Sequence, residues 1–149
     1  MAQTFTKLLA HIIFSTKDRA PCIALALRPD LFAYLGGIVR GLQGKALAVN
    51  GTSDHVHMLA SLPPTRCVSE VVRDVKANSS HWVRQKKGQH TFSWQAGYGA
   101  FSVSQSNVDD VMRYIASQEE HHRRVTFQEE FLAFLKKYGI DYDNRYIWQ

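Results

Sequence analysis

The sequence predicts an α+β fold, a ferredoxin-like βαββαβ antiparallel sheet with its helices on one face, followed by a C-terminal helical extension. Apolar runs rich in β-branched residues alternate with segments in which apolar residues recur at helical spacing. Their order along the chain is strand, helix, strand, strand, helix, strand. The length of 149 residues fits one domain, expected over residues 1–149.

The first half of the chain predicts a strand, a helix and a hairpin. The strand covers residues 8–16, which are apolar and β-branched. Pro29 stands at a favourable helix start, and the helix that follows it ends at Gly44. Residues 46–50 and 55–62 are expected to pair as a hairpin across a short turn.

The middle of the chain predicts the second helix and the last strand of the sheet. The helix covers about residues 68–87, with valines and Trp82 on its apolar stripe. Residues 92–104 are expected to be extended, and the glycines within them should bend or bulge the strand.

The helical extension is predicted as two helices. The first covers about residues 107–124, and Ser106 and Asp109 stand at the spacing of a capping box at its start. The second helix and its aromatic tail cover about residues 127–149, with Gly139 closing the helix. The aromatic residues of the tail are expected to dock on the rest of the molecule.

Composition restricts the classes of function. A chain that is 45% hydrophobic and 21% charged is globular, which excludes a disordered tail protein. The net charge of +5 points to anionic partners, nucleic acid first, although a merely soluble basic protein has the same charge. Two cysteines without Cys-x-x-Cys spacing fit a reducing cytoplasm, and the apolar run 8–14 is too short for a membrane span. A cytoplasmic protein without a membrane partner is therefore expected.

His55 and His57 are the first candidate site. In a strand, residues i and i+2 point to the same face, so the two imidazoles stand side by side while Val56 points into the core. Paired imidazoles suit a divalent metal, and two protein ligands leave positions open for substrate oxygens. The alternative is a pair of surface histidines on a half-exposed strand.

Tyr114 and Gln118 are the second candidate site, four residues apart on one flank of the predicted helix. A phenol at its ordinary pKa of about 10 is a poor nucleophile unless a cation or a base assists it. A metal that also binds a phosphate could help by polarising the phosphoryl group, and the Gln118 amide could be a further hard ligand. The alternative is a boundary tyrosine that buries its ring.

A basic flank of the second helix is the third candidate. Helical spacing places four cations on one side of it: Arg73, Lys76, Arg84 and Lys87. Such a face contacts phosphates well, and the alternative is an ordinary solvated helix face.

Taken together, these segments resemble the single-tyrosine HUH transposases, which are the IS200-like transposases of bacterial and archaeal insertion sequences. The resemblance extends over nearly the whole chain. The segments that carry it are HIIFSTKDR (11–19), GTSDHVHML (51–59), VKANSSHWV (75–83), WQAGYGAFSVS (94–104) and YIASQEEHH (114–122).

The resemblance implies a mechanism and a set of site residues. His55 and His57 would bind a divalent ion, Mg²⁺ or Mn²⁺, and Gln118 would complete the metal site. Tyr114 would attack a DNA phosphodiester and form a 5′-phosphotyrosine bond that leaves a free 3′-OH. That 3′-OH would later attack another phosphotyrosine and rejoin the strands.

The resemblance also implies the partners. The substrate would be single-stranded DNA at element ends, recognised through imperfect hairpins. Family members of this length are usually homodimers whose subunits share active sites, and residues 92–104 could pair across a two-fold axis as an edge strand. Whether Tyr114 acts in its own subunit or in the partner's stays open.

Two other functions stay open beside an active transposase. One is a domesticated endonuclease of the same chemistry that acts on dispersed repeat hairpins. The other is a non-catalytic ferredoxin-like nucleic-acid-binding module, which predicts that Tyr114→Phe leaves function unchanged.

Overall fold

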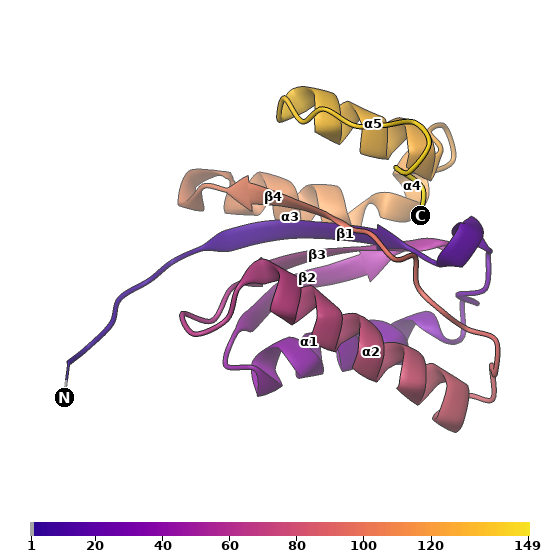
Figure 1. The fold of residues 1–149 in the computed structure, drawn as a ribbon, viewed down its shortest axis with the longest axis horizontal. Coiled ribbons are helices and arrows are strands. Elements are labelled where there is room, and N and C mark those ends of the chain that lie inside the picture. Colours follow the sequence, from indigo (N-terminus) through magenta and orange to yellow (C-terminus); the bar gives the residue numbers. More distant parts are fainter. Residues whose placement is uncertain (1) are drawn as a thin grey trace.

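A four-stranded antiparallel sheet organises the chain in the computed structural model, which describes residues 2–149 (Figure 1). The strands lie side by side in the order β2-β3-β1-β4. This is the order of the split βαββαβ arrangement, so the predicted α+β class is confirmed. The bounds of the strands are β1 Leu9–Ser15, β2 Lys45–Gly51, β3 His55–Ser61 and β4 Gly99–Val103.

Two helices, α1 (Arg28–Gly41) and α2 (Val68–Lys86), cover the first face of the sheet (Figure 1). Every second residue of the central strands packs against them in one core, including Phe14 and Val56, both fully buried. Val56 thus points into this core, as the alternation along a strand predicts.

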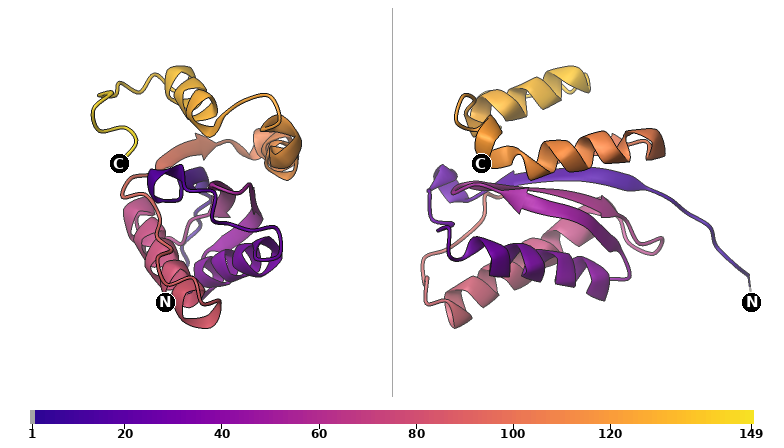
Figure 2. Two further views of the ribbon diagram at one scale, coloured as in Figure 1. Left: turned by 90° about the vertical axis from the view of Figure 1, so that its right-hand side faces the viewer. Right: turned by 180° about the vertical axis from the view of Figure 1, so that it is seen from behind.

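Three further helices, α3 (Val108–Ala116), α4 (Gln118–His121) and α5 (Phe127–Lys137), lie on the second face (Figure 2). Side chains of α3 pack against β2 and β3, and side chains of α5 pack against β1 and β4. The apolar side of α3 faces the sheet, since Ile115 is buried there with three partly buried neighbours: Val108, Val111 and Met112.

Because both faces of the sheet are covered, β3 is buried along most of its length. His55 and His57 point to the second face, opposite Val56, and pair in register with Ser15 and Ile13 of β1. The histidines therefore lie over the middle of the sheet, beneath the level of α3 and α5, and not on a half-exposed surface.

The helix predicted over 107–124 is broken in two. Ser117 leaves the helical conformation (φ −99°, ψ 21°) between α3 and α4. The predicted capping box at Ser106 and Asp109 is also wrong, because Asn107 is the N-cap and has no side-chain cap, while Ser106 hydrogen-bonds Ser104. A short 3-10 turn over Gln105–Asn107 precedes α3 and replaces that cap.

The extended segment predicted over 92–104 is shorter as a strand. Only Gly99–Val103 pairs with β1, while Trp94 forms an isolated bridge to Thr16. The helix α1 also ends earlier than expected, at Gly41, and Gln43 rather than Gly44 takes the left-handed conformation with φ 73°.

Of the aromatic residues in the C-terminal tail, Trp148 docks as predicted, whereas Tyr142 and Tyr146 stay exposed. Gly139 closes α5 with φ 64°. Trp148 then packs against Phe127 and Phe131 of α5, and the backbone N–H of Gly97 donates to the carbonyl of Gln149 at 2.9 Å. Across the described residues, no helix combines the length and the apolar character needed to cross a bilayer.

Candidate active site

His55 and His57 form the floor of the site. Both side chains are fully buried, and their ring centroids lie 5.2 Å apart. Nδ1 of His55 lies 2.7 Å from Oδ1 of Asp54, so the ring donates its N–H to this carboxylate. That bond leaves the Nε2 lone pair of His55 facing the site, the arrangement that orients metal-binding histidines.

Gln118 reaches the site because the chain breaks at Ser117. Its Nε2 donates to the carbonyl of Tyr114 at 3.2 Å, and its Oε1 then faces His55 Nε2 at 3.4 Å. The end of α3 is held by Asn50 of β2, whose amide donates to the carbonyl of Ile115 at 2.9 Å. Gln118 is fully buried, which an exposed helix flank would not produce.

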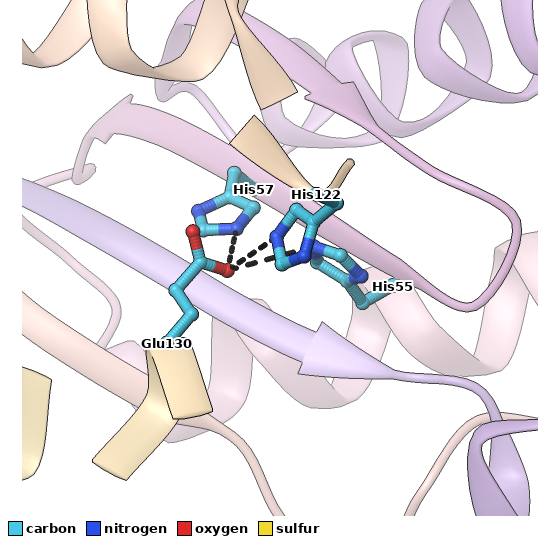
Figure 3. Close-up of side chains that lie close together, drawn as sticks. All are labelled: His55, His57, His122 and Glu130. Carbon is cyan, nitrogen blue, oxygen red and sulfur yellow. Dashed lines mark hydrogen bonds and ion pairs between the residues drawn. The ribbon is translucent and has the colours of Figure 1, made fainter. Parts of the chain in front are cut away.

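Glu130 of α5 lies among the imidazoles (Figure 3). Its Oε1 is 2.9 Å from Nε2 of His57 and 2.9 Å from Nε2 of His122, and it is 3.6 Å from Nε2 of His55. One ligand atom from each of these four residues lies within 4.8 Å of the others. Hydrogen bonds from His122 and His57 outweigh burial and hold the pKa of Glu130 well below its usual range.

Tyr114 meets the same carboxylate from α3. Its hydroxyl donates to Oε2 of Glu130, and His121 Nε2 lies 3.3 Å from that oxygen. The ring centroids of Tyr114 and His57 are 5.8 Å apart, within one chain. Burial raises the pKa of the Tyr114 phenol, and the Glu130 carboxylate raises it further, so the hydroxyl keeps its proton in this state.

His11 of β1 supports the floor from the side. Its Nε2 lies 2.8 Å from Nδ1 of His57, so one ring donates an N–H to the other. Burial lowers the pKa of His11 to about 3 and that of His57 to about 4. Both rings are therefore neutral near pH 7, and neutral imidazole is the form that binds metals.

The donor atoms fit a divalent cation. His55 Nε2 and Gln118 Oε1 face each other at 3.4 Å. Both atoms are hydrogen-bond acceptors, because His55 donates its N–H to Asp54 and the Gln118 amide donates to the carbonyl of Tyr114. A cation between them would satisfy both. Nitrogen and oxygen ligands of this kind suit Mn²⁺ and, with more oxygen and water ligands, Mg²⁺.

Two openings reach the site from the surface. A cavity of about 350 Å³ borders Tyr114, and its walls include His11, Phe134 and Lys137. A second cavity of about 340 Å³ borders His122, with Arg28 and Arg123 in its walls. Each cavity thus has a cationic side chain beside a residue of the site.

The basic flank lies elsewhere, because α2 covers the opposite face of the sheet (Figure 1). Arg73 is exposed and pairs with its neighbour Asp74, whereas Lys87 pairs with Asp30 at 2.8 Å. Arg84 donates to the carbonyl of Phe92. Lys76 donates to three carbonyls, those of Gln95, Ala96 and Gly97, so its ammonium holds this segment in place.

Sequence reasoning missed four residues of the site. His11 and Glu130 are separated from the two predicted motifs. His121 and His122 lie three and four residues after Gln118, but no role was predicted for either. One signal was present in the sequence. Glu130 lies in the stripe of α5 that also contains Phe127, Phe131 and Leu135, and a carboxylate in an apolar stripe indicates a buried partner.

Sequence comparison places the chain among known proteins. Residues 4–118 match the family model described as "Transposase IS200 like". Two relatives, the transposases for insertion sequence element IS200 of Salmonella typhimurium and Salmonella typhi, are each 26% identical over 119 residues. In both cases the match covers 76% of this chain and 78% of the relative.

Solved structures share the fold. One is the crystal structure of a Deinococcus radiodurans protein described as a transposase, with a TM-score of 0.59 and 22% identity over 79% of this chain and 95% of that one. Another is a REP-associated tyrosine transposase bound to a REP hairpin, with a TM-score of 0.62 and 16% identity over 84% of this chain and 74% of that one. Since the family model spans most of the chain, the protein belongs to the IS200-like transposase family.

Proposed function

We propose that residues 1–149 form one transposase domain that cleaves and rejoins single-stranded DNA through a 5′-phosphotyrosine intermediate, with Tyr114 as the nucleophile. The observation that supports this most is the position of the Tyr114 ring 5.8 Å from His57 within one chain, in a family of DNA transposases. The same arrangement supports the use of Tyr114 in its own subunit.

His55, His57 and Gln118 would hold the ion, Mg²⁺ or Mn²⁺, through Nε2 of each histidine and Oε1 of the glutamine. When bound, the ion would polarise a phosphoryl oxygen of the DNA as a Lewis acid. Asp54 and His11 would hold the two imidazoles in place by hydrogen bonds to their other ring nitrogens.

Tyr114 would carry out the transfer. Its Oη forms a bond to phosphorus while the bond from phosphorus to the 3′-oxygen breaks, and the 3′-oxygen leaves and takes up a proton as a 3′-OH. The phenolic proton passes to solvent or to the carboxylate that it already contacts. The phosphotyrosine keeps the energy of the broken bond, so a later attack by a 3′-OH can rejoin strands without a nucleotide cofactor.

The substrate would be a DNA hairpin at the end of a mobile element. A structural neighbour is described as bound to a REP hairpin, and the α2 flank of Arg73, Lys76, Arg84 and Lys87 offers cations for a DNA backbone. A homodimer would form through β4, which is an edge of the sheet with an unpaired side.

The first experiment tests the nucleophile. Single-stranded oligonucleotides copied from the DNA that flanks the gene are mixed with protein and Mn²⁺, and an SDS-stable protein–DNA adduct is measured. We expect the adduct with the wild type and with Tyr142→Phe, a control at an exposed tyrosine. Tyr114→Phe should form none and still bind the hairpin, because only one hydroxyl is lost. Adduct formation by Tyr114→Phe would contradict the nucleophile assignment.

The second experiment tests the metal site. We expect His57→Ala to lose metal-dependent cleavage while it keeps hairpin binding, since the imidazole is a ligand and not a DNA contact. His90→Ala, at an exposed histidine, serves as the matched control. Cleavage by His57→Ala at the wild-type rate in Mn²⁺ would show that the metal is held elsewhere.

A further inference from the structure

We propose that Glu130 is itself a ligand of the metal, and that its second carboxylate oxygen holds Tyr114, so that α5 links the metal to the nucleophile. This inference rests on the proposed function, because it adds a ligand to the metal site described there. The family match ends at residue 118, so Glu130 and His122 come from the part of the chain beyond it.

The separations around Oε1 of Glu130 are those of ligands on one ion. This oxygen lies 2.9 Å from Nε2 of His57, 2.9 Å from Nε2 of His122 and 3.6 Å from Nε2 of His55. Adjacent ligands of an octahedral ion with bonds of about 2.1 Å lie about 3.0 Å apart. The four side chains also converge from β3, α5 and the segment after α4 (Figure 3).

The charge balance favours a cation next to Glu130. Its side chain is only 2% exposed, and a buried carboxylate costs several kcal/mol unless it is paired. Among residues 2–149, its ion-pair partners are all histidines, and no lysine or arginine reaches it. A divalent ion bound at Oε1 would supply positive charge directly beside this buried carboxylate.

The position of the carboxylate is fixed by the start of α5. Thr126 caps the helix by accepting a hydrogen bond from the backbone N–H of Glu129, and the Glu129 side chain completes the capping box. Phe127 and Phe131 anchor the same turn in the core beside β1 and β4. The metal therefore meets a pre-positioned oxygen, and little conformational entropy is lost on binding.

The two oxygens of Glu130 have different partners. Oε1 faces the imidazoles of His55, His57 and His122. Oε2 accepts the hydrogen bond from the Tyr114 hydroxyl and lies 3.3 Å from His121 Nε2. Glu130 would thus be a positioning residue for the nucleophile at the same time as it is a ligand. Tyr114 itself contacts the far oxygen and would not be a ligand.

The test is a titration of Mn²⁺ into the full chain without DNA, followed by calorimetry and by the EPR signal of free Mn²⁺. We expect Glu130→Gln to weaken Mn²⁺ binding about tenfold or more, because a charged ligand is lost. Glu119→Gln removes the same charge from an exposed site nearby and should bind as the wild type does.

The outcomes separate this inference from the proposed function. Wild-type affinity in Glu130→Gln, with no binding by the His55→Ala, His57→Ala double variant, would overturn the Glu130 ligand and leave the proposed metal site intact. Equal binding by the double variant, or none by the wild type, would overturn both. Thermal unfolding in EDTA checks folding. If Glu130→Gln does not fold, Glu130→Asp replaces it, because this variant shortens the side chain by one methylene. We expect Glu130→Asp to weaken Mn²⁺ binding as well. Wild-type affinity in Glu130→Asp would overturn the assignment of Glu130 as a ligand.

The link to Tyr114 has its own readout in the near-ultraviolet absorbance of the phenol. Saturating Mn²⁺ should give a tyrosine difference spectrum in the wild type and none in Tyr114→Phe, because the ion binds the carboxylate that holds the hydroxyl. The signal should also be absent from Glu130→Gln at Mn²⁺ concentrations that saturate this variant. Its persistence there would show that Glu130 does not connect the two.

Discussion

Asp54 lies at the edge of the site and orients the imidazole of its neighbour His55 for metal binding. Its carboxylate accepts hydrogen bonds from Nδ1 of His55 at 2.7 Å and from the hydroxyl of Thr52 at 3.1 Å. The hydrogen bond from His55 outweighs burial and lowers the pKa of Asp54, so the carboxylate is charged near neutral pH. A charged acceptor fixes the His55 tautomer and makes Nε2 a stronger ligand.

We predict that Asp54→Asn lowers Mn²⁺ affinity by roughly 10- to 100-fold, the effect expected for a hydrogen-bond partner of a ligand. Calorimetric titration measures the change. Asp141→Asn, at an exposed aspartate, is the control and should leave affinity unchanged. If Asp54→Asn binds Mn²⁺ as tightly as the wild type, the Asp54 carboxylate does not tune His55.

At the scale of elements, the contact between α5 and β4 sets the height of Glu130 above the sheet. Gly99 begins β4 directly under the ring of Phe131, and a Cβ there would lie 2.7 Å from a carbon of this ring. It would also lie 3.0 Å from the ring of Phe101. The close approach of α5 to the sheet therefore requires glycine at this position, and α5 in turn brings Glu130 to the histidines.

We predict that Gly99→Ala destabilises the protein by about 1–3 kcal/mol through overpacking, which lowers Tm by several degrees. Differential scanning calorimetry measures this. Gly41→Ala is the matched control, because a Cβ at Gly41 meets no atom within 4 Å and should leave Tm unchanged or slightly higher. A Gly99→Ala protein as stable as the wild type would mean that Phe131 moves aside freely.

At the scale of the whole molecule, the candidate active site and the basic flank of α2 lie on opposite faces of the sheet. The imidazoles and Tyr114 lie between the sheet and the helices α3 to α5, whereas α2 and its cations cover the opposite face (Figures 1 and 2). A DNA strand that contacts both the candidate active site and the basic flank would pass around an edge of the sheet. The segment held by Lys76, residues 95–97, lies on such a path beside β4.

We predict different effects for two cations of this flank. Arg73→Ala should lower the salt slope of hairpin binding by about 0.7 to 0.9 with no loss of stability, because its surface pair with Asp74 contributes little. Lys76→Ala should lower the free energy of unfolding, since three carbonyls lose their donor. Binding measured from 50 to 200 mM salt, with urea unfolding, checks both. An unchanged slope in Arg73→Ala would remove it from the DNA contacts.

Local patterns in the sequence determined the order of the elements. Strand and helix periodicities predicted the βαββαβ order, and the alternation along β3 placed both histidines on one face with Val56 on the other. These features depend on neighbours a few residues apart, which is why one sequence suffices to predict them. The break at Ser117 was not predicted, because the preceding helix ends on a hydrogen bond from Asn50, a residue of a distant strand.

Tertiary structure alone decided which further residues complete the site. His11, His57, Tyr114 and Glu130 are separated by dozens of residues in most pairs. The pairing of β1 with β3 brings His11 to His57, and the packing of α3 and α5 on the second face brings Tyr114 and Glu130 to them. Sequence spacing carries no information about such contacts, because they depend on how whole elements pack. The sequence determined which residues could do chemistry, and packing determined that a buried carboxylate joins them.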